Sequence, residues 1–341
     1  MLSVLLLLMA AVGTQAKSWK IGPNSVVGMD FASINAAMES AKVLTGDTLF
    51  LDQFYKDGSE QNVTKQVVII GTGYDTSFSD EQVVASLTGA LNLKANNVVV
   101  KSVWLYDVYF YNDDCTLERC YVASNVQTKS ATAGMNHIYS CYIVGTIQGY
   151  SGSQFSQLDI QNNAIVCYDP RTQIQHLTSS VIDHNTIVNY NTDYYYDWCY
   201  CLYNINNTSV TNNIILRVFD SYYNQDINYF FEDGYGNTLE HNILSRSDGS
   251  GFPTNKFGYG GSVSELFVST GNYSNYYKLA EKSAAKGYAT DGGDVGCHGG
   301  MFGCPSGGRP QYIPYFSKVT VGARTENGKL PVSVSVKIQD E

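Results

Sequence analysis

Apolar positions recur at a regular interval through the middle of the chain, with polar positions between them. Six short segments align on reference residues that are 21, 22, 22, 28 and 29 positions apart: Cys120, Cys141, Asn163, Asn185, Asn213 and Asn242. An apolar residue always stands three positions earlier (Leu117, Ile138, Ile160, Ile182, Val210 and Leu239) and two positions later (Val122, Ile143, Ile165, Ile187, Ile215 and Leu244). This repetition predicts a solenoid, in which each repeat buries its apolar side by stacking on the next.

The composition of the two apolar columns indicates which solenoid forms. They hold mostly Ile and Val, which favour pleated strands, whereas a leucine-rich repeat requires spaced leucines. No helical stripe follows the strands. We therefore predict an all-β fold, a right-handed parallel β-helix. The Asn of each repeat should form a bend, because Asn tolerates the left-handed conformation and bonds to nearby backbone. Stacked Asn side chains could also bond one another from coil to coil.

The strands of such a solenoid should alternate between inward and outward side chains. The residues two positions before each bend can all face water: Glu118, Tyr139, Gln161, Asp183, Thr211 and Glu240. This alternation is what a strand with one buried face requires. Val99, Ser102 and Trp104 fit the same template, which indicates that the coils begin before residue 100.

The ends of a solenoid need covers, because the terminal coils expose apolar side chains and strand edges. Apolar residues recur at helical spacing before a strand over residues 48–51: Phe31, Ile34, Ala37, Met38 and Ala41. Residues 330–338 alternate as a strand. We predict a signal peptide over residues 1–16, a helical N-terminal cap with the first strands over 17–60, the β-helix over 61–290, and a C-terminal cap with a β tail over 291–341.

The N-terminus has the pattern of an export signal. Residues 2–12 are almost wholly apolar and precede Thr14-Gln15-Ala16, which is typical of a cleavage site, although no basic residue opens the segment. The stretch is too short for a transmembrane helix, and no other segment is apolar enough for one. We expect a secreted, periplasmic or cell-surface protein with no transmembrane segment in the mature chain.

Charge and composition narrow the choice of partner. The formal net charge of −10 argues against nucleic acid as a partner. Charged residues make up 15% of the chain, against roughly 25% in a typical domain, while Tyr occurs 27 times. A polar but lightly charged surface suits a neutral, hydroxyl-rich ligand, although Tyr also serves simply as a strand former. We expect a monomer.

Eight cysteines in an exported chain permit disulfides, but their connectivity cannot be deduced from sequence. Cys120 and Cys141 occupy equivalent places in successive coils, where stacked free thiols are favoured although the strand spacing would also allow a bridge. Cys297 and Cys304 could staple the loop between them. A zinc site built from these two residues and His298 lacks a fourth ligand at ordinary spacing, so no metal site is predicted.

Three stretches carry a resemblance to a known group of proteins. They are residues 28–38 with Gly46-Asp47-Thr48-Leu49, the Asn-bearing coils, and residues 282–287 with Asp294-Val295-Gly296-Cys297-His298-Gly299-Gly300. Together they resemble the exported pectate-lyase-like right-handed parallel β-helix proteins of Bacteroidetes, many of which have no known function. The resemblance implies the fold and export. It implies little about activity, because that superfamily includes lyases, hydrolases and adhesins.

Two long repeats suggest where a ligand binds. The last two intervals exceed 22 residues, so extra chain leaves adjacent coils side by side between Asn185 and Asn242. Aromatic and acidic residues fill these insertions, and we predict that they contact substrate: Tyr194, Tyr195, Tyr196, Trp198, Tyr222, Tyr223, Glu232 and Asp233. Aromatic rings stack on the apolar faces of sugars, while carboxylates accept hydroxyl hydrogen bonds. These aromatics could alternatively pack on one another and cover the edge of the coils.

The candidate catalytic residues lie on the outward line of the strands. Asp183-His184 and Glu240-His241 occupy equivalent places two coils apart, about 9.6 Å at the backbone. Flexible carboxylates on that frame could reach the separation of about 6.5–9.5 Å that inverting glycosidases use. A lyase would also need a cation, for which calcium is possible, or an Arg, and Arg217 is the nearest one. Each of these pairs is more often a plain solvated strand face.

These observations favour an exported β-helix that binds or processes polysaccharide, as a polysaccharide lyase or glycoside hydrolase would. The alternative is a glycan-binding or adhesive cell-surface protein without catalysis. A catalytic protein should gather two carboxylates, or calcium with an Arg, in one groove, whereas a binding protein should show only an aromatic strip.

Overall fold

The protein is described here by a computed structural model. It describes residues 16–74, 84–130, 134–150, 156–168, 173–190, 201–217, 231–232, 234–245, 254–256, 265–269, 277–304, 307–308, 315–321 and 332–337. The signal peptide expected over residues 1–16 lies almost wholly outside them. Among the described residues, no helix is both long enough and apolar enough to cross a membrane.

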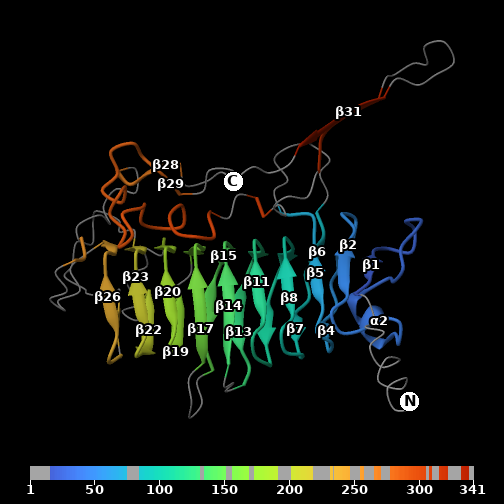
Figure 1. The fold of residues 1–341 in the computed structure, drawn as a ribbon, viewed down its shortest axis with the longest axis horizontal. Coiled ribbons are helices and arrows are strands. Elements are labelled where there is room, and N and C mark those ends of the chain that lie inside the picture. The colour runs from blue at the N-terminus through green and yellow to red at the C-terminus, as the bar shows by residue number, and fades with distance from the viewer. Residues whose placement is uncertain are drawn as a thin grey trace, which may run out of the picture.

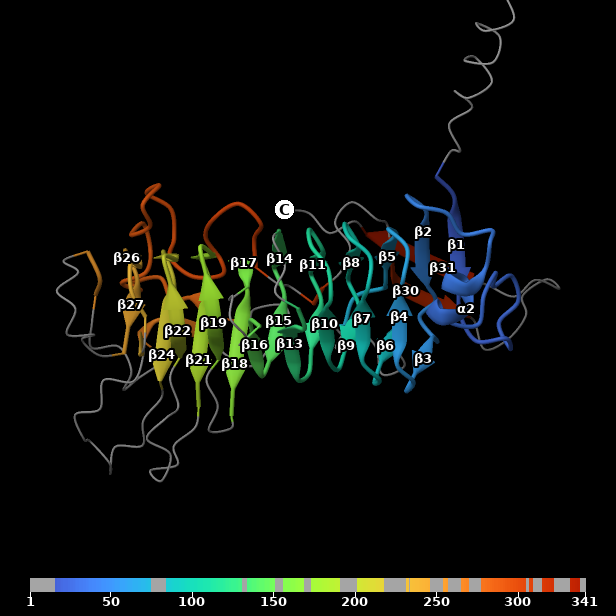
Figure 2. The ribbon, with the colours of Figure 1, turned by 90° about the horizontal axis from the view of Figure 1, so that it is seen from below.

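The chain winds into three long parallel sheets, and each coil gives one strand to each sheet in turn (Figures 1 and 2). The parallel β-helix predicted from the repeat is therefore confirmed. The first sheet contains β1 (Ser18–Ile21), β2 (Thr48–Leu51), β5 (Val68–Ile70), β8 (Val99–Lys101), β11 (Thr116–Glu118), β14 (Met135–Tyr139), β17 (Gln157–Gln161), β20 (Val181–Asp183), β23 (Ser209–Thr211) and β26 (Thr238–Glu240).

The other two sheets follow the same order along the axis. The second sheet contains β3 (Lys56–Asp57), β6 (Ser86–Leu87), β9 (Trp104–Leu105), β12 (Tyr121–Val122), β15 (Tyr142–Val144), β18 (Ala164–Cys167), β21 (Thr186–Asn189), β24 (Ile214–Arg217) and β27 (Ile243–Leu244). The third sheet contains β4 (Gln61–Val63), β7 (Leu91–Leu93), β10 (Val108–Phe110), β13 (Asn125–Thr128), β16 (Thr146–Gln148), β19 (Ile174–Thr178), β22 (Leu202–Asn206) and β25 (Phe231–Glu232). We call the turn between the first and second sheets the first corner, and the turn between the second and third sheets the second corner.

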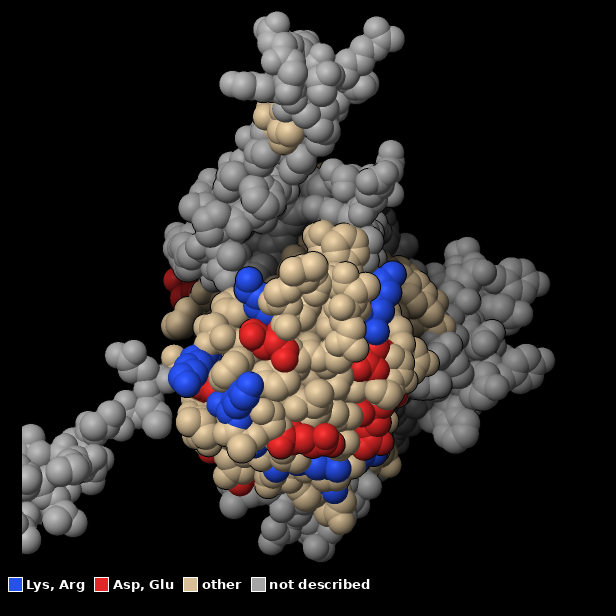
Figure 3. Space-filling model, turned by 90° about the vertical axis from the view of Figure 1, so that its right-hand side faces the viewer, with Lys and Arg blue, Asp and Glu red and all other residues tan. Residues whose placement is uncertain are grey.

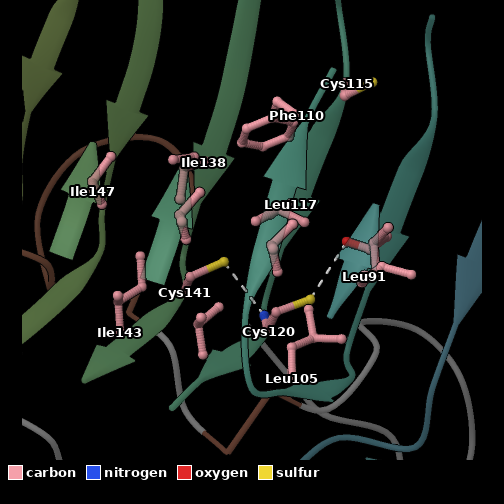
Figure 4. Packing of buried hydrophobic residues seen from close by; sticks show 14 of the residues in the cluster. Leu91, Leu105, Phe110, Cys115, Leu117, Cys120, Ile138, Cys141, Ile143 and Ile147 are labelled. Carbon is pink, nitrogen blue, oxygen red and sulfur yellow. Dashed lines mark hydrogen bonds between the residues drawn. The ribbon is translucent and has the colours of Figure 1, made fainter. Parts of the chain in front are cut away.

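The two predicted apolar columns form the interior of the solenoid. The column from Leu117 to Leu239 pairs in register along the first sheet, and the column from Val122 to Leu244 pairs along the second. Figure 4 shows these side chains pointing toward one another between the strands. Cys120 and Cys141 are stacked free thiols as expected, with the Cys120 amide donating to the Cys141 sulfur at 3.4 Å.

A ladder of buried Asn side chains runs along the first corner. The side-chain oxygen of each Asn accepts the backbone N–H of the equivalent residue in the preceding coil, as Asn185 does from Asn163 at 2.9 Å and Asn213 from Asn185 at 2.8 Å. The predicted bonding from coil to coil is confirmed. Asn255, which the repeat did not reveal, adds a further rung beyond Asn242 at 3.0 Å.

The ladder Asn is not the left-handed residue, and this part of the prediction is wrong. Positive φ angles belong to the residue immediately before each reference residue, whether that is Cys or Asn: Arg119, Ser140, Asn162, His184, Asn212 and His241, with φ between 51° and 57°. The ladder side chain must stay buried so that its amide reaches both neighbouring coils. The preceding residue therefore makes the turn.

The N-terminal helix expected from the apolar spacing is present as α2 (Ile34–Glu39). The Ser33 side chain caps it by accepting the Ala36 amide, and the helix buries Ile34, Ala37 and Met38. Figure 3, which faces this end of the solenoid, shows Lys and Arg interspersed with Asp and Glu around a largely uncharged surface. The helix thus covers apolar side chains where the coils begin.

The segment after the last coil runs back along the solenoid, which the sequence did not predict. Residues 277–304, which we call the strap, run back along the outside of the first corner (Figure 1). They pass from His241, whose ring nitrogen lies 2.8 Å from the Tyr288 carbonyl, to Ser140, whose hydroxyl donates to the Phe302 carbonyl at 2.9 Å. Residues 291–304 therefore lie along the side of the solenoid, whereas the sequence suggested a cover for its end.

The strap follows this path because the outer face of the second sheet is apolar. Val166, Val188 and Leu216 face outward there and are buried, so they form a second hydrophobic core with strap residues that include Ala285 and Val295. Two short antiparallel pairs complete the described structure, β28 (Phe267–Ser269) with β29 (Lys278–Leu279) and β30 (Tyr315–Val321) with β31 (Val332–Lys337). The strand predicted in the tail is confirmed by β31.

Candidate functional site

The structure places the two candidate catalytic carboxylates where the repeat predicted. Asp183 ends β20 and Glu240 ends β26, and Thr211 of β23 stands in register between them. Asp183 is heavily engaged: one carboxylate oxygen lies 2.7 Å from Nδ1 of His184, and the other accepts from the Thr211 hydroxyl at 2.7 Å and from Nδ2 of Asn212 at 2.9 Å.

Burial alone would raise the pKa of Asp183, but the bonds from His184, Thr211 and Asn212 outweigh it and hold the pKa below its usual range. Asp183 is thus fixed in the ionised form. In an inverting pair it could act only as the base, and Glu240 would have to be the acid.

The two histidines face the strap and not an open groove. The His184 ring is buried, with Gly299 and Gly300 packed directly against it. The His241 ring lies 5.2 Å from that of Tyr288, centroid to centroid. Arg217 is the last residue of β24 and so lies at the second corner, whereas Asp183 ends β20 at the first corner. Catalysis by these residues stays a prediction.

The predicted substrate-binding residues lie largely outside the described part of the chain. This holds for Tyr194, Tyr195, Tyr196, Trp198, Tyr222, Tyr223 and Asp233, while the backbone of Glu232 pairs with Tyr203 in the third sheet. The strands that flank the two insertions are described. Strand β21 pairs with β24, and β22 pairs with β25, so both insertions leave and re-enter the solenoid at the second corner of adjacent coils.

A groove lies at the same corner, a few coils closer to the N-terminus. It has a volume of about 190 Å³ and is lined by uncharged residues: Tyr106, Ala123, Ser124, Val144, Gly145, Cys167 and Tyr168. Backbone bonds join Tyr106 to Ser124 and Gly145 to Val166, so the lining comes from four successive coils. The groove therefore extends along the axis over three strand spacings, about 14 Å.

Exposed tyrosines stand at both ends of the groove. Tyr106 is 47% exposed at one end and Tyr168 is 61% exposed at the other. Tyr168 stacks on Tyr190 with ring centroids 5.3 Å apart, and the Tyr190 hydroxyl lies 3.3 Å from that of the buried Tyr277. One wall is therefore a fixed aromatic platform next to the residues where the first insertion begins.

A glycine of the groove lining lets two neighbouring coils approach each other closely. Gly145 has φ of +147°, and a Cβ at this position would overlap the carbonyl oxygen of Ser124. The repeating columns do not reveal this site, because Tyr106, Gly145 and Tyr168 follow their strands in the turns and stand outside those columns. The one available signal was the recurrence of Tyr just after strands of the second sheet, at 106, 168 and 190.

A second polar cluster, also missed, lies on the outer face of the first sheet. The Tyr139 hydroxyl donates to Asp159 at 2.5 Å and lies 2.8 Å from Nδ1 of His137, and Gln161 donates to the other Asp159 oxygen at 2.6 Å. Burial and the Asp159 carboxylate raise the pKa of Tyr139. Burial opposes the shift of Asp159, yet bonds from His137, Tyr139 and Gln161 lower its pKa. The Tyr139 ring stacks on the ring of Phe302 in the strap, with centroids 4.1 Å apart. The polar groups of this cluster thus bond to one another, and its aromatic ring is covered by the strap.

One group among the described residues brings three metal-ligating side chains together, namely Cys297, His298 and Cys304 of the strap. It contains sulfur and nitrogen atoms, which suit zinc, whereas calcium requires oxygen ligands. Comparisons of the chain with family models, with curated proteins and with solved structures found no match. Geometry alone must therefore indicate what the protein does.

Proposed function

We propose that this protein is an exported parallel β-helix that binds a neutral polysaccharide in the groove at the second corner. The observation that carries the proposal is the pairing of two exposed tyrosine platforms, Tyr106 and Tyr168, across an uncharged floor. Aromatic faces stack on the apolar faces of sugar rings, and backbone and hydroxyl groups between them bond to sugar hydroxyls. The Tyr-rich insertions begin at the same corner and would extend this surface.

The charge of the groove argues for a neutral ligand. None of its lining residues is charged, while the whole chain has a formal net charge of −10. An anionic polymer would meet repulsion and no compensating Lys or Arg in this groove. We therefore expect neutral glucans, mannans or galactans to bind better than uronic acid polymers.

The decisive experiment measures retention on a panel of polysaccharides, followed by calorimetry with the best ligand. Replacement of Tyr168 or Tyr106 by Ala should each weaken binding about tenfold, because each removes one stacking platform. Tyr235→Ala is the matched control, since Tyr235 is 69% exposed on the opposite side of the third sheet, near Asn207. No retention on any glycan, or equal losses in all three variants, would overturn the proposal.

Processing of the polymer is a second candidate function, favoured by the register of Asp183 and Glu240 on the first sheet. Incubation of the purified protein with the bound glycan, with assays for new reducing ends and for unsaturated products, tests it. If the pair cleaves the polymer, Glu240→Gln should abolish product formation and leave binding in the groove unchanged. Binding without any product would leave a non-catalytic glycan-binding protein of the cell surface or secreted fraction.

A further inference from the structure

The strap carries a compact cluster of sulfur and nitrogen ligands that the proposed function does not use. Cys297 is buried, and its sulfur lies 3.7 Å from the sulfur of Cys304. The ligand atoms of these two residues and of His298 all lie within 4.8 Å of one another. At this separation the two sulfur atoms are not bonded to each other.

These separations match a metal site and not a covalent bond. In a tetrahedral zinc site with Zn–S bonds of about 2.3 Å, two sulfur ligands stand about 3.8 Å apart. A disulfide requires about 2.05 Å between them. We propose that Cys297, His298 and Cys304 bind a zinc ion, with the fourth position open to water or to an external ligand. Two thiolates and an imidazole are a donor set that selects zinc over calcium or magnesium.

The backbone around the cluster is held in place before any metal binds. The Cys297 amide donates to the Thr186 hydroxyl at 3.1 Å. The Asn162 side chain donates to the carbonyl of Cys297 at 3.2 Å and to that of Gly299, and it accepts the amide of Phe302 at 3.3 Å. Asn162 and Thr186 belong to the solenoid, so the ligand loop is fastened to a rigid frame. Such outer contacts fix the orientation of ligands in metal sites.

The test begins with the full chain purified without chelators, under conditions that keep thiols reduced. Its zinc content, measured by plasma mass spectrometry, should be about one per chain, and replacement by Co²⁺ should give the thiolate-to-metal charge-transfer band of a tetrahedral site. The variants Cys297→Ser, Cys304→Ser and His298→Ala should each lose most of the metal and the band. Cys115→Ser, which changes a buried thiol inside the solenoid, should keep both.

Circular dichroism shows whether each variant retains its β structure, and Co²⁺ titration of the unmutated chain keeps the test valid if a variant does not fold. Peptide mapping is the second measurement, because an exported protein meets oxidants. A Cys297–Cys304 disulfide in the secreted protein would overturn the proposal, and so would failure of the reduced chain to take up zinc or cobalt. Equal metal loss in Cys115→Ser would also overturn it.

Discussion

Ser140, Asn162, His184, Asn212 and His241 occupy equivalent places on successive coils, and each turns the chain with a positive φ. Their side chains point away from the interior, toward the strap. Ser140, Asn162, Asn212 and His241 bond to it, and His184 packs beneath its glycines. One residue position per repeat therefore both bends the backbone and fastens the C-terminal segment. The repeat predicted the bend to within one residue, but it could not reveal the fastening, because the partner lies far away in the sequence.

The ladder Asn of each coil should be costly to remove. Asn185 is fully buried, accepts the amide of Asn163, and donates to the carbonyls of Ile160 and Asp183. Asn185→Ala leaves several backbone groups without partners and should lower the free energy of unfolding by about 3 kcal/mol. Urea titration measures this, with the exposed Asn24→Ala as control. Equal stability of the two variants would contradict the structural role of the ladder.

The Asp159 cluster predicts a specific dependence of stability on pH. The folded protein holds the pKa of Asp159 below its ordinary value of 3.8, so the ionised carboxylate stabilises the fold above that value. This contribution is lost as the pH falls through the folded pKa. The difference in unfolding free energy between the unmutated chain and Asp159→Asn should therefore be full at neutral pH and shrink below about pH 4. Urea titrations at several pH values measure it, and a difference that does not change with pH would refute it.

At the scale of elements, the two apolar columns predicted the strands of the first and second sheets, while helical spacing predicted α2 and alternation predicted β31, because these periods are local properties of the sequence. The strands of the third sheet were not predicted. The strap and its second core were not predicted. A signal was nevertheless present: Ala164–Cys167 and Ile214–Leu216 are continuous apolar runs, which are typical of strands buried on both faces. These runs indicate that another segment covers the second sheet, but only the tertiary structure shows that the strap is this segment.

The second core gives a prediction about the strap. Val188 lies between the second sheet and the strap, so Val188→Asp places a charge where it cannot be solvated. The strap should detach while the solenoid persists, and limited proteolysis should cut residues 277–304 well before any coil. Val181→Asp is the control, because Val181 lies half-buried on the outer face of the first sheet. Equal cleavage of both variants, or global unfolding of the first one alone, would argue against a separable layer.

At the scale of the whole molecule, the Asn ladder and the strap join coils that would otherwise contact only their neighbours. The strap contacts the solenoid from His241, through Tyr288, to Ser140, through Phe302. Beyond the strap, the carbonyl of Gly307 accepts the amide of Tyr74 at 2.9 Å. We expect the coils between them to unfold together.

Hydrogen exchange in native conditions measures this coupling. The amides of Cys141, Asn163, Asn185 and Asn213, which donate into the ladder, should exchange with one common free energy of opening. In Val188→Asp, where the strap is detached, the free energy of opening should differ from one coil to the next. Unequal protection in the unmutated protein would show that each coil opens independently.

The return of the C-terminal segment also determines which end of the solenoid an attached surface or partner would hold. A chain that comes back to Tyr74 delivers its final strands β30 and β31 to the half of the solenoid where residue 16 begins (Figure 1). An attachment at residue 16 or at β31 would therefore hold that half, and β26 would project at the opposite end. A label or cargo meant for that end should be grafted into the coil that contains β26.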